Sequence, residues 1–200
     1  MEFYNSIDQP AEAVYKDRGS KFIAYAYPIG SVDDFKQRLV QLKKDHPKAA
    51  HHCFAYRVGF DGNQFRASDD GEPAGTAGKV ILGQIDSKEV CNIAIIVVRY
   101  FGGTLLGVPG LINAYKMAAL LVLQVVPVVQ KPVMIAYSLQ FDYTQMNDIM
   151  LMLKQMQAVV ISQEIQLFNL LKIQVPKSRK KEFEYRIQNL PNVTWSIQGL

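Results

Sequence analysis

The sequence has few cysteines and no spacing typical of a structural metal site. Cys53 and Cys91 are its only two cysteines in 200 residues. This excludes a disulfide framework, and both thiols are predicted to be reduced and buried. His51 and His52 precede Cys53, but consecutive strand residues face opposite sides and no second Cys/His pair follows at zinc spacing. His51 shares the Cys53 side, so a nucleophilic pair is the alternative to the favoured core cysteine. We expect no resident metal and no cofactor.

The sequence also lacks a targeting signal and a long uninterrupted apolar segment. Its first residues, MEFYNSIDQPAEA, contain neither the basic nor the apolar region of a signal peptide. The longest apolar stretches, NIAIIVV and MAALLVLQVVPVV, are too short or too interrupted to span a bilayer. We therefore expect a cytoplasmic protein with no membrane partner.

A strong excess of charge of one sign is missing as well. The chain has 22 Lys and Arg against 18 Asp and Glu, a net charge of +4, and 49% hydrophobic residues. This composition predicts an ordinary globular protein with a full core. Residues 131–200 carry 8 basic and 5 acidic side chains, whereas residues 1–130 carry 14 and 13. The mild positive charge permits an acidic partner such as RNA without requiring one.

Apolar periodicity and turn residues predict an α+β chain with two domains, 1–130 and 131–200. In the first we predict a helix over 31–45 with Ser31 as its N-cap, a hairpin turning at 61–63, and a buried central strand over 90–101. A helix follows with Pro109 in its first turn. The proline-containing stretch 125–132 is predicted to be the boundary between the domains.

The second domain is predicted to have the order β-α-β-β-α-β, which is the ferredoxin-like arrangement. Its predicted strands are 132–141, 158–165, 167–176 and 192–198, and its predicted helices are 142–157 and 178–190. Asp142 with Gln145 resembles a capping box, and Ser178 is the predicted cap of the last helix.

RYFGGTLLGVPG, residues 99–110, joins the predicted central strand to a helix. Glycines allow an anion to approach the backbone N–H groups at a helix N-terminus, and an arginine adds a charged fork. The spacing matches neither of the common glycine-rich nucleotide-binding motifs. Two interpretations therefore stay open: a tight structural connection, and an anion or nucleic-acid site that includes Arg99, Tyr100, Gly102 and Gly103.

SDDGEPAGTAG, residues 68–78, contains three carboxylates within four positions: Asp69, Asp70 and Glu72. Such a cluster suits a hard divalent cation or acid–base chemistry. The spacing is not that of an EF-hand, and capping of the helix after Pro73 or pairing with Arg66 or Arg99 is favoured over a metal site or a contact with a partner. A candidate cleft would consist of the three carboxylates together with Gly75 and Thr76, the threonine bonding to the turn backbone.

KSRKKEFEYR, near the C-terminal end of the sequence, concentrates positive charge. Basic residues interleaved with aromatics can follow a nucleic-acid backbone. The more frequent alternative is a solvated helix face with Phe183 and Ile187 in the core. The candidate phosphate contacts are Lys177, Arg179, Lys180 and Lys181.

SDDGEPAGTAGKVIL followed by VVRYFGGTLLGVPGLINAY resembles the IMPACT/YigZ family. KFIAYA and HHCFAYRVG resemble further segments of that family in the expected order. The resemblance implies an N-terminal domain with a fold shared by a ribosomal-protein domain and GHMP kinases. It also implies a C-terminal ferredoxin-like domain similar to the last domain of elongation factor G. Leu105, Pro109 and Asn113 depart from the family pattern, which often has polar, glycine and arginine residues there.

Eukaryotic members of the family regulate translation, so the resemblance implies a translation-associated role. We predict a non-catalytic regulatory protein that binds RNA or the ribosome. The first alternative is an enzyme acting on a small phosphorylated or peptide substrate in a cleft of carboxylates and glycine loop. The second alternative is a protein-interaction module that uses exposed aromatics.

Overall fold

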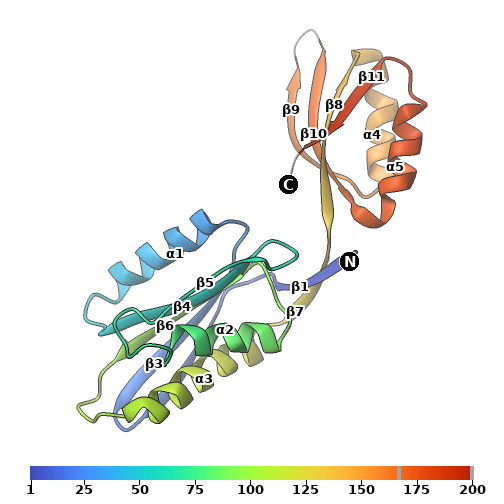
Figure 1. Ribbon diagram of the computed structural model, residues 1–200. Coiled ribbons are helices and arrows are strands. Elements are labelled where there is room, and N and C mark those ends of the chain that lie inside the picture. The colour runs from blue at the N-terminus through green and yellow to red at the C-terminus, as the bar shows by residue number, and fades with distance from the viewer. Residues whose placement is uncertain (166–167, 199–200) are drawn as a thin grey trace. The chain divides into compact units, whose positions relative to one another are not determined.

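The computed structural model of the chain describes residues 1–165 and 168–198. It has two compact units (Figure 1). The N-terminal unit is Tyr4–Lys131, and the C-terminal unit is Pro132–Leu200 together with Met1–Phe3. Each unit combines strands with helices, so the chain belongs to the predicted α+β class.

A five-stranded antiparallel sheet, in the order β2-β3-β6-β4-β5, forms the middle of the N-terminal unit. Its strands are β2 (Ala11–Asp17), β3 (Ser20–Pro28), β4 (His51–Val58), β5 (Gln64–Ser68) and β6 (Ile93–Tyr100). Strand β6 is central and is buried from Ile93 through Arg99. The predicted central strand is confirmed, because a strand covered on both faces needs apolar side chains in both directions.

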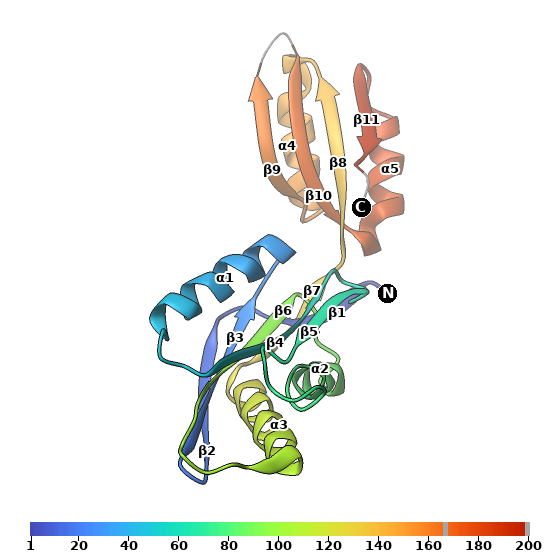
Figure 2. The same cartoon turned by 60° about the vertical axis from the view of Figure 1, so that its left-hand side comes forward.

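Helices cover both faces of this sheet (Figure 2). Helix α1 (Val32–Asp45) lies on one face, and α2 (Gly78–Ser87) and α3 (Gly107–Val125) lie on the other. Even-numbered residues of β6 pack in the core beneath α1, and odd-numbered residues pack in the core beneath α2 and α3. This alternation decides which face each side chain of β4 and β6 reaches.

The start of α1 is confirmed in detail. The Ser31 hydroxyl accepts a hydrogen bond from the Asp34 backbone N–H at 3.1 Å, and the Asp34 carboxylate accepts one from the Ser31 N–H at 3.0 Å. These two bonds form a capping box, which satisfies backbone donors that the first helical turn cannot pair internally.

Helix α3 begins at Gly107, so Pro109 lies in its first turn as predicted. Contrary to the expectation from the interrupted apolar stretch, its 19 residues are long and apolar enough to cross a membrane by length and composition. Seven of its residues are buried, and they belong to the core of the N-terminal unit. An apolar helix packed in this way is a core helix of the fold.

The proline-containing boundary stretch includes a strand that the sequence patterns do not predict. Strand β7 (Val128–Pro132) pairs with β1 (Phe3–Ile7) in a two-stranded sheet. Strands β1 and β2 are likewise not predicted, because their short segments mix charged and apolar residues and lie at sheet edges or in the two-stranded sheet.

The C-terminal unit follows the predicted order β-α-β-β-α-β. Its elements are β8 (Met134–Phe141), α4 (Met146–Gln155), β9 (Val159–Ile165), β10 (Asn169–Pro176), α5 (Lys180–Gln188) and β11 (Val193–Ile197). The strands form an antiparallel sheet in the order β11-β8-β10-β9, and both helices contribute to a core that includes Tyr137, Ile149 and Phe183. Residue 167, where the predicted strand 167–176 begins, lies outside the described residues.

Neither predicted cap in this unit has the predicted geometry. Ser178 lies inside a 3₁₀ turn, Lys177–Arg179, and α5 begins after it without a side-chain cap. Asp142 accepts a hydrogen bond from the Thr144 N–H at 3.2 Å and so caps a 3₁₀ turn, Tyr143–Gln145, with no capping box. In each case a short 3₁₀ turn precedes the α-helix and moves its first turn away from the capping residue.

Candidate functional site

A buried ion pair lies between the sheet and α3 in the N-terminal unit. The Arg99 guanidinium donates through Nη1 to Glu72 Oε1 at 2.6 Å, and the two side chains are only 7% and 3% exposed. The Tyr115 hydroxyl of α3 donates to the same oxygen at 2.7 Å. Such short bonds to an ionised group in a dry environment are strong, and they fix the Glu72 carboxylate in place.

His51 lies beside this pair because the register of β4 and β6 sets it opposite Arg99. Its Nδ1 is 2.8 Å from the Asp70 carbonyl oxygen. A carbonyl only accepts, so Nδ1 carries a proton and donates it there. The other ring nitrogen, Nε2, lies 3.9 Å from Glu72 Oε1, too far for a hydrogen bond.

A cavity of about 530 Å³ opens beside these three side chains. This volume lies within the range typical of small-molecule sites. Apart from His51, Glu72 and Arg99, its lining is almost entirely apolar: Ala50, Pro73, Phe101, Leu105, Leu106, Gly107, Val108 and Leu111. The Arg99 guanidinium carbon is 5.7 Å from the centre of the Phe101 ring. The glycine-rich loop that follows β6 therefore forms one wall of the cavity.

Arg99 also retains a donor without a partner. Its Nε–H is buried and makes no hydrogen bond within the residues that the structure describes. Leaving a buried donor unpaired costs about 1–3 kcal/mol. Arg99 lines the cavity, but its Nε is closed off from the cavity surface, so the guanidinium donor open to a bound molecule is Nη2, which has no partner among the described residues and is not among the buried polar atoms.

The glycines of the loop are required by the loop itself. A Cβ on Gly102 would lie 1.9 Å from the backbone carbon of Gly19 in the β2–β3 turn, and the Gly102 N–H donates to the Ser20 hydroxyl at 3.1 Å. Gly103 has φ +86°, a conformation that L side chains rarely adopt. These contacts support the structural interpretation of Gly102 and Gly103, and the Gly102 amide is already occupied.

Tyr100 does not share a site with Arg99. Adjacent residues of β6 point to opposite faces, so Tyr100 lies on the α1 side, where its hydroxyl is 2.8 Å from His46 Nδ1. The Tyr25 hydroxyl is 2.9 Å from the other ring nitrogen of His46. Burial raises the pKa of Tyr25 to about 12. The predicted grouping of Arg99 with Tyr100 is therefore corrected to two separate faces.

The three carboxylates of the SDDGEP segment do not converge. The Asp70 carboxylate accepts from the His52 N–H at 2.6 Å and lies 3.6 Å from Lys43 Nζ, whereas Glu72 turns to Arg99. Across residues 1–165 and 168–198, no group of three or more His, Cys, Asp or Glu side chains could hold a metal ion. Pairing with Arg99 is therefore confirmed for Glu72, whereas the cation beside Asp70 is a lysine that the sequence does not indicate.

Asp69 holds the turn that leads into α2. Its carboxylate accepts hydrogen bonds from the backbone N–H groups of Gly75, Ala77 and Gly78 at 2.8–3.0 Å. Burial opposes ionisation of this carboxyl, but the three amide donors outweigh it and lower its pKa. The Thr76 hydroxyl donates to the Pro73 carbonyl oxygen at 2.7 Å, as predicted for this turn. Asp69, Gly75 and Thr76 thus have structural contacts beside the cavity and do not line it.

Cys53 is a core cysteine. Its Sγ lies 2.9 Å from the Asp69 carbonyl oxygen and 3.3 Å from the Tyr115 hydroxyl oxygen. Burial raises the pKa of the thiol to about 12. Since the thiolate is the nucleophile, this environment disfavours a catalytic cysteine.

The basic residues of the C-terminal unit are partly neutralised within their own helix. Arg179 lies 2.8 Å from Glu182, and Lys180 lies 3.8 Å from Glu184. Lys177 and Lys181 are exposed, and neither forms an ion pair with a residue that the structure describes. Phe183 and Ile187 are fully buried, as the solvated-helix interpretation expects.

Sequence reasoning does not find the whole cavity. It indicates that a carboxylate such as Glu72 can pair with Arg99, but it does not place His51 beside them, and it does not identify Tyr115 or Phe101 as members of the site. One available signal is the alternation along the two strands, which places residues 51, 53, 97 and 99 on one face. The identity of Tyr115 as the partner of Glu72 depends on helix packing and has no local sequence signal.

The fold and the site together define an α+β protein with a buried, neutral ion pair beneath a mostly apolar cavity. A family model described as the Impact N-terminal domain matches residues 18–123. IMPACT family member YigZ of Escherichia coli (strain K12) is 36% identical over 180 residues, covering 89% of this chain and 88% of that protein. IMPACT family member YvyE of Bacillus subtilis (strain 168) is 31% identical over 149 residues, covering 74% of this chain and 69% of that protein.

A solved structure described as the crystal structure of an hypothetical protein is similar over the whole chain. It has 33% sequence identity and a TM-score of 0.79, with coverage of 100% of this chain and 98% of that chain. These similarities confirm the predicted resemblance: the chain belongs to the IMPACT family.

Proposed function

We propose that the chain is a non-catalytic regulatory protein of translation that binds RNA or the ribosome. Its membership of the IMPACT family supports a translation-related role, because the family resemblance implies one for eukaryotic members. Protein IMPACT of Rattus norvegicus is 35% identical over 96 residues, which cover 46% of this chain and 30% of the rat protein. The common part therefore lies in one portion of the rat protein, and the proposal does not extend to its other portions.

The proposed domain folds agree with this role. We infer that the N-terminal unit has the ribosomal-protein and GHMP-kinase type of fold, and that the C-terminal unit is ferredoxin-like, similar to the last domain of elongation factor G. The β-α-β-β-α-β order and the sheet order β11-β8-β10-β9 support the second assignment.

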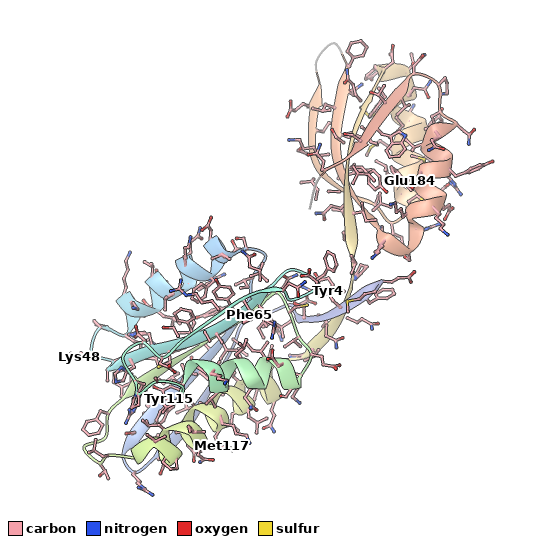
Figure 3. The ribbon with its side chains drawn as sticks, viewed as in Figure 1. Tyr4, Lys48, Phe65, Tyr115, Met117 and Glu184 are labelled. Atoms are coloured by element: carbon pink, nitrogen blue, oxygen red, sulfur yellow. The ribbon has the colours of Figure 1, made fainter. Side chains whose placement is uncertain are left out.

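Exposed cations around the glycine-rich loop are the observation that carries the proposal. Arg18 and Lys21 flank the β2–β3 turn against which Gly102 packs, and Lys48 stands two residues before Ala50 of the cavity wall. Figure 3 shows Lys48 at the same end of the N-terminal unit as Tyr115. All three cations are exposed, and none is ion-paired with a residue in the described part of the chain. Positive side chains at such a rim attract phosphates and leave the apolar interior for other contacts.

The contacts of the three carboxylates support the enzyme alternative less than they support a structural role for these side chains. Asp69 and Asp70 bond to backbone amides, and Glu72 is neutralised by Arg99. The exposed apolar residues beside the loop fit a pure protein-interaction module less well, because exposed positive charge accompanies them.

Fluorescence anisotropy of a labelled single-stranded RNA tests the proposal. With an RNA of about 12 nucleotides and about 50 to 300 mM salt, log Kobs should fall with log[salt] with a slope of roughly −0.7 per phosphate neutralised. Replacing Arg18, Lys21 and Lys48 together by glutamine should reduce the size of that slope by up to about 2. Replacing Lys177 and Lys181 by glutamine tests the contribution of the C-terminal unit in the same way.

The matched control replaces two exposed lysines, Lys44 and Lys88, which lie outside both basic groups. This variant should retain the wild-type slope. Absence of RNA binding at low salt, together with absence of ribosome co-sedimentation, would refute the proposal.

A further inference from the structure

We propose that the cavity beside His51, Glu72 and Arg99 takes one unpaired nucleobase. The inference rests on the proposed function, because the base would belong to an RNA strand held by the surrounding cations. It adds a specific contact to what would otherwise be recognition of phosphates alone.

The polar floor of the cavity offers donors and acceptors without net charge. Arg99 and Glu72 neutralise each other at 2.6 Å, so a bound anion would be repelled by Glu72 and a bound cation would be repelled by Arg99. In the hydrogen bonds of the described residues Arg99 uses only Nη1 and Glu72 uses only Oε1, so the Arg99 Nη2 donor and the second Glu72 oxygen remain for a ligand. His51 donates through Nδ1 to the Asp70 carbonyl, which leaves Nε2 available as an acceptor when the ring is neutral.

A complementary ligand group is therefore neutral and carries an acceptor next to a donor. The hydrogen-bonding edges of nucleobases have this pattern. A phosphate has acceptors only, and an ammonium has donors only. A carboxylate would satisfy the Arg99 donor but would lie against the Glu72 carboxylate.

The walls of the cavity suit a flat apolar ring. Phe101 is 52% exposed at the cavity and lies close to Arg99, and Leu105 and Val108 are also largely exposed there. Exposed aromatic side chains commonly stack on unpaired bases in single-stranded RNA. Leu106 and Leu111 are buried and close the inner side. The base would thus insert between the loop 101–107 and the polar floor.

Three exposed cations, Arg18, Lys21 and Lys48, lie near the loop and the cavity wall, where they would contact the sugar-phosphate backbone of an inserted base. Lys48 is close in sequence to Ala50, and the Ala50 N–H donates to the Arg99 carbonyl oxygen at 2.8 Å. Arg18 and Lys21 reach the loop through the contact between Gly102 and the β2–β3 turn. Base and phosphate contacts are therefore available at neighbouring places in the same unit.

Titration of the full chain with uncharged nucleosides, followed by ¹H–¹⁵N NMR, tests the inference apart from phosphate binding. Adenosine, guanosine, cytidine and uridine are added separately, and at least one should shift the backbone amides of the loop 101–107 in a saturable, salt-independent manner. Phe101→Ala should weaken that binding by at least about 5-fold, the lower limit for removal of a base-stacking aromatic. Val108→Trp should block the opening and abolish it.

Phe65→Ala is the matched control, because Phe65 is a similarly exposed phenylalanine, 55% exposed, on β5 and outside the cavity. Figure 3 shows Phe65 away from the end of the N-terminal unit at which Lys48 and Tyr115 lie. This variant should bind nucleosides as the wild type does. Equal weakening by Phe65→Ala and Phe101→Ala would overturn the assignment of the binding site.

Two further probes separate the remaining outcomes. Loop shifts caused by N-acetylglutamine amide but by no nucleoside would replace the base by a peptide side chain, and shifts caused by ribose 5-phosphate alone would indicate an anion site. Salt-dependent RNA binding without any nucleoside response would overturn this inference and leave the proposed function intact. Nucleoside binding without RNA binding would reject an RNA base as the occupant, and if ribosome co-sedimentation were also absent it would refute the proposed function.

Discussion

Replacing Arg99 by methionine should strongly destabilise the N-terminal unit. Methionine retains much of the buried aliphatic volume but leaves the Glu72 carboxylate, 3% exposed, without its counter-charge. Breaking a buried ion pair by removing one partner costs about 3–5 kcal/mol, and no discount for solvent screening applies at this depth. At about 2–4 °C per kcal/mol for chains of this size, the melting temperature should fall by roughly 6–20 °C.

The single tryptophan makes the measurement specific to one unit. Trp195 lies on β11 of the C-terminal unit, so its fluorescence reports unfolding there, whereas far-ultraviolet circular dichroism reports both units. Urea titrations of wild type and Arg99→Met should therefore show a loss in the dichroism transition that the fluorescence transition does not fully share. Adding Glu72→Gln to Arg99→Met should recover much of the loss, because it removes the unpaired charge. A loss below about 1 kcal/mol in the single variant would refute the description of a tightly buried pair.

Three other predictions follow from the same unit. Gly102→Ala should destabilise the N-terminal unit by about 1–3 kcal/mol or more in urea titrations, because the new Cβ would overlap the backbone of the β2–β3 turn. The control Gly83→Ala, in open space on α2, should stabilise the unit by up to about 1 kcal/mol. Cys53 and Cys91 should react with a thiol reagent at pH 8 much more slowly in the native protein than in urea, since burial raises both pKa values; equal rates would contradict this. Asp69 has a lowered folded-state pKa, so its stabilising contribution is present above its unfolded value of about 3.9 and is lost as pH falls through the lower folded value. Asp69→Asn should accordingly lower the urea midpoint at pH 7, and its difference from wild type should narrow on acidification below about pH 4; a constant difference would contradict the linkage.

Strong local patterns allowed much of the fold to be predicted from the sequence. The apolar run of β6 could only be a strand buried on both faces, and Ser31 with Asp34 marks the start of α1. The sequence does not predict the edge strand β2, because none of its residues is fully buried and its charged and apolar residues alternate only weakly. The Ser178 cap was predicted wrongly because a 3₁₀ turn precedes α5, and a good capping residue does not determine which turn type comes first.

The candidate site was predictable only in part, for a geometric reason. Arg99 and Glu72 could be proposed as a pair, but their depth depends on the register of β4 against β6 and on the packing of α3. Arg99 and Tyr100 were grouped because they are adjacent in sequence, whereas strand alternation sends them to opposite faces. Candidate functional residues in a strand are therefore better grouped by taking every second residue, which shares a face of the sheet, than by taking neighbours in the sequence.

The pairing of β1 with β7 has a consequence for how the chain is made. About 120 residues separate the two strands, so a ribosome adding about 5–20 residues per second synthesises β7 roughly 6 to 24 s after β1. During that interval the edge of β1 that will pair with β7 presents unpaired backbone donors and acceptors, which is the condition under which strands pair with foreign chains. The pairing that closes the N-terminal unit is thus a late event, because β1 is synthesised long before the strand that pairs with it.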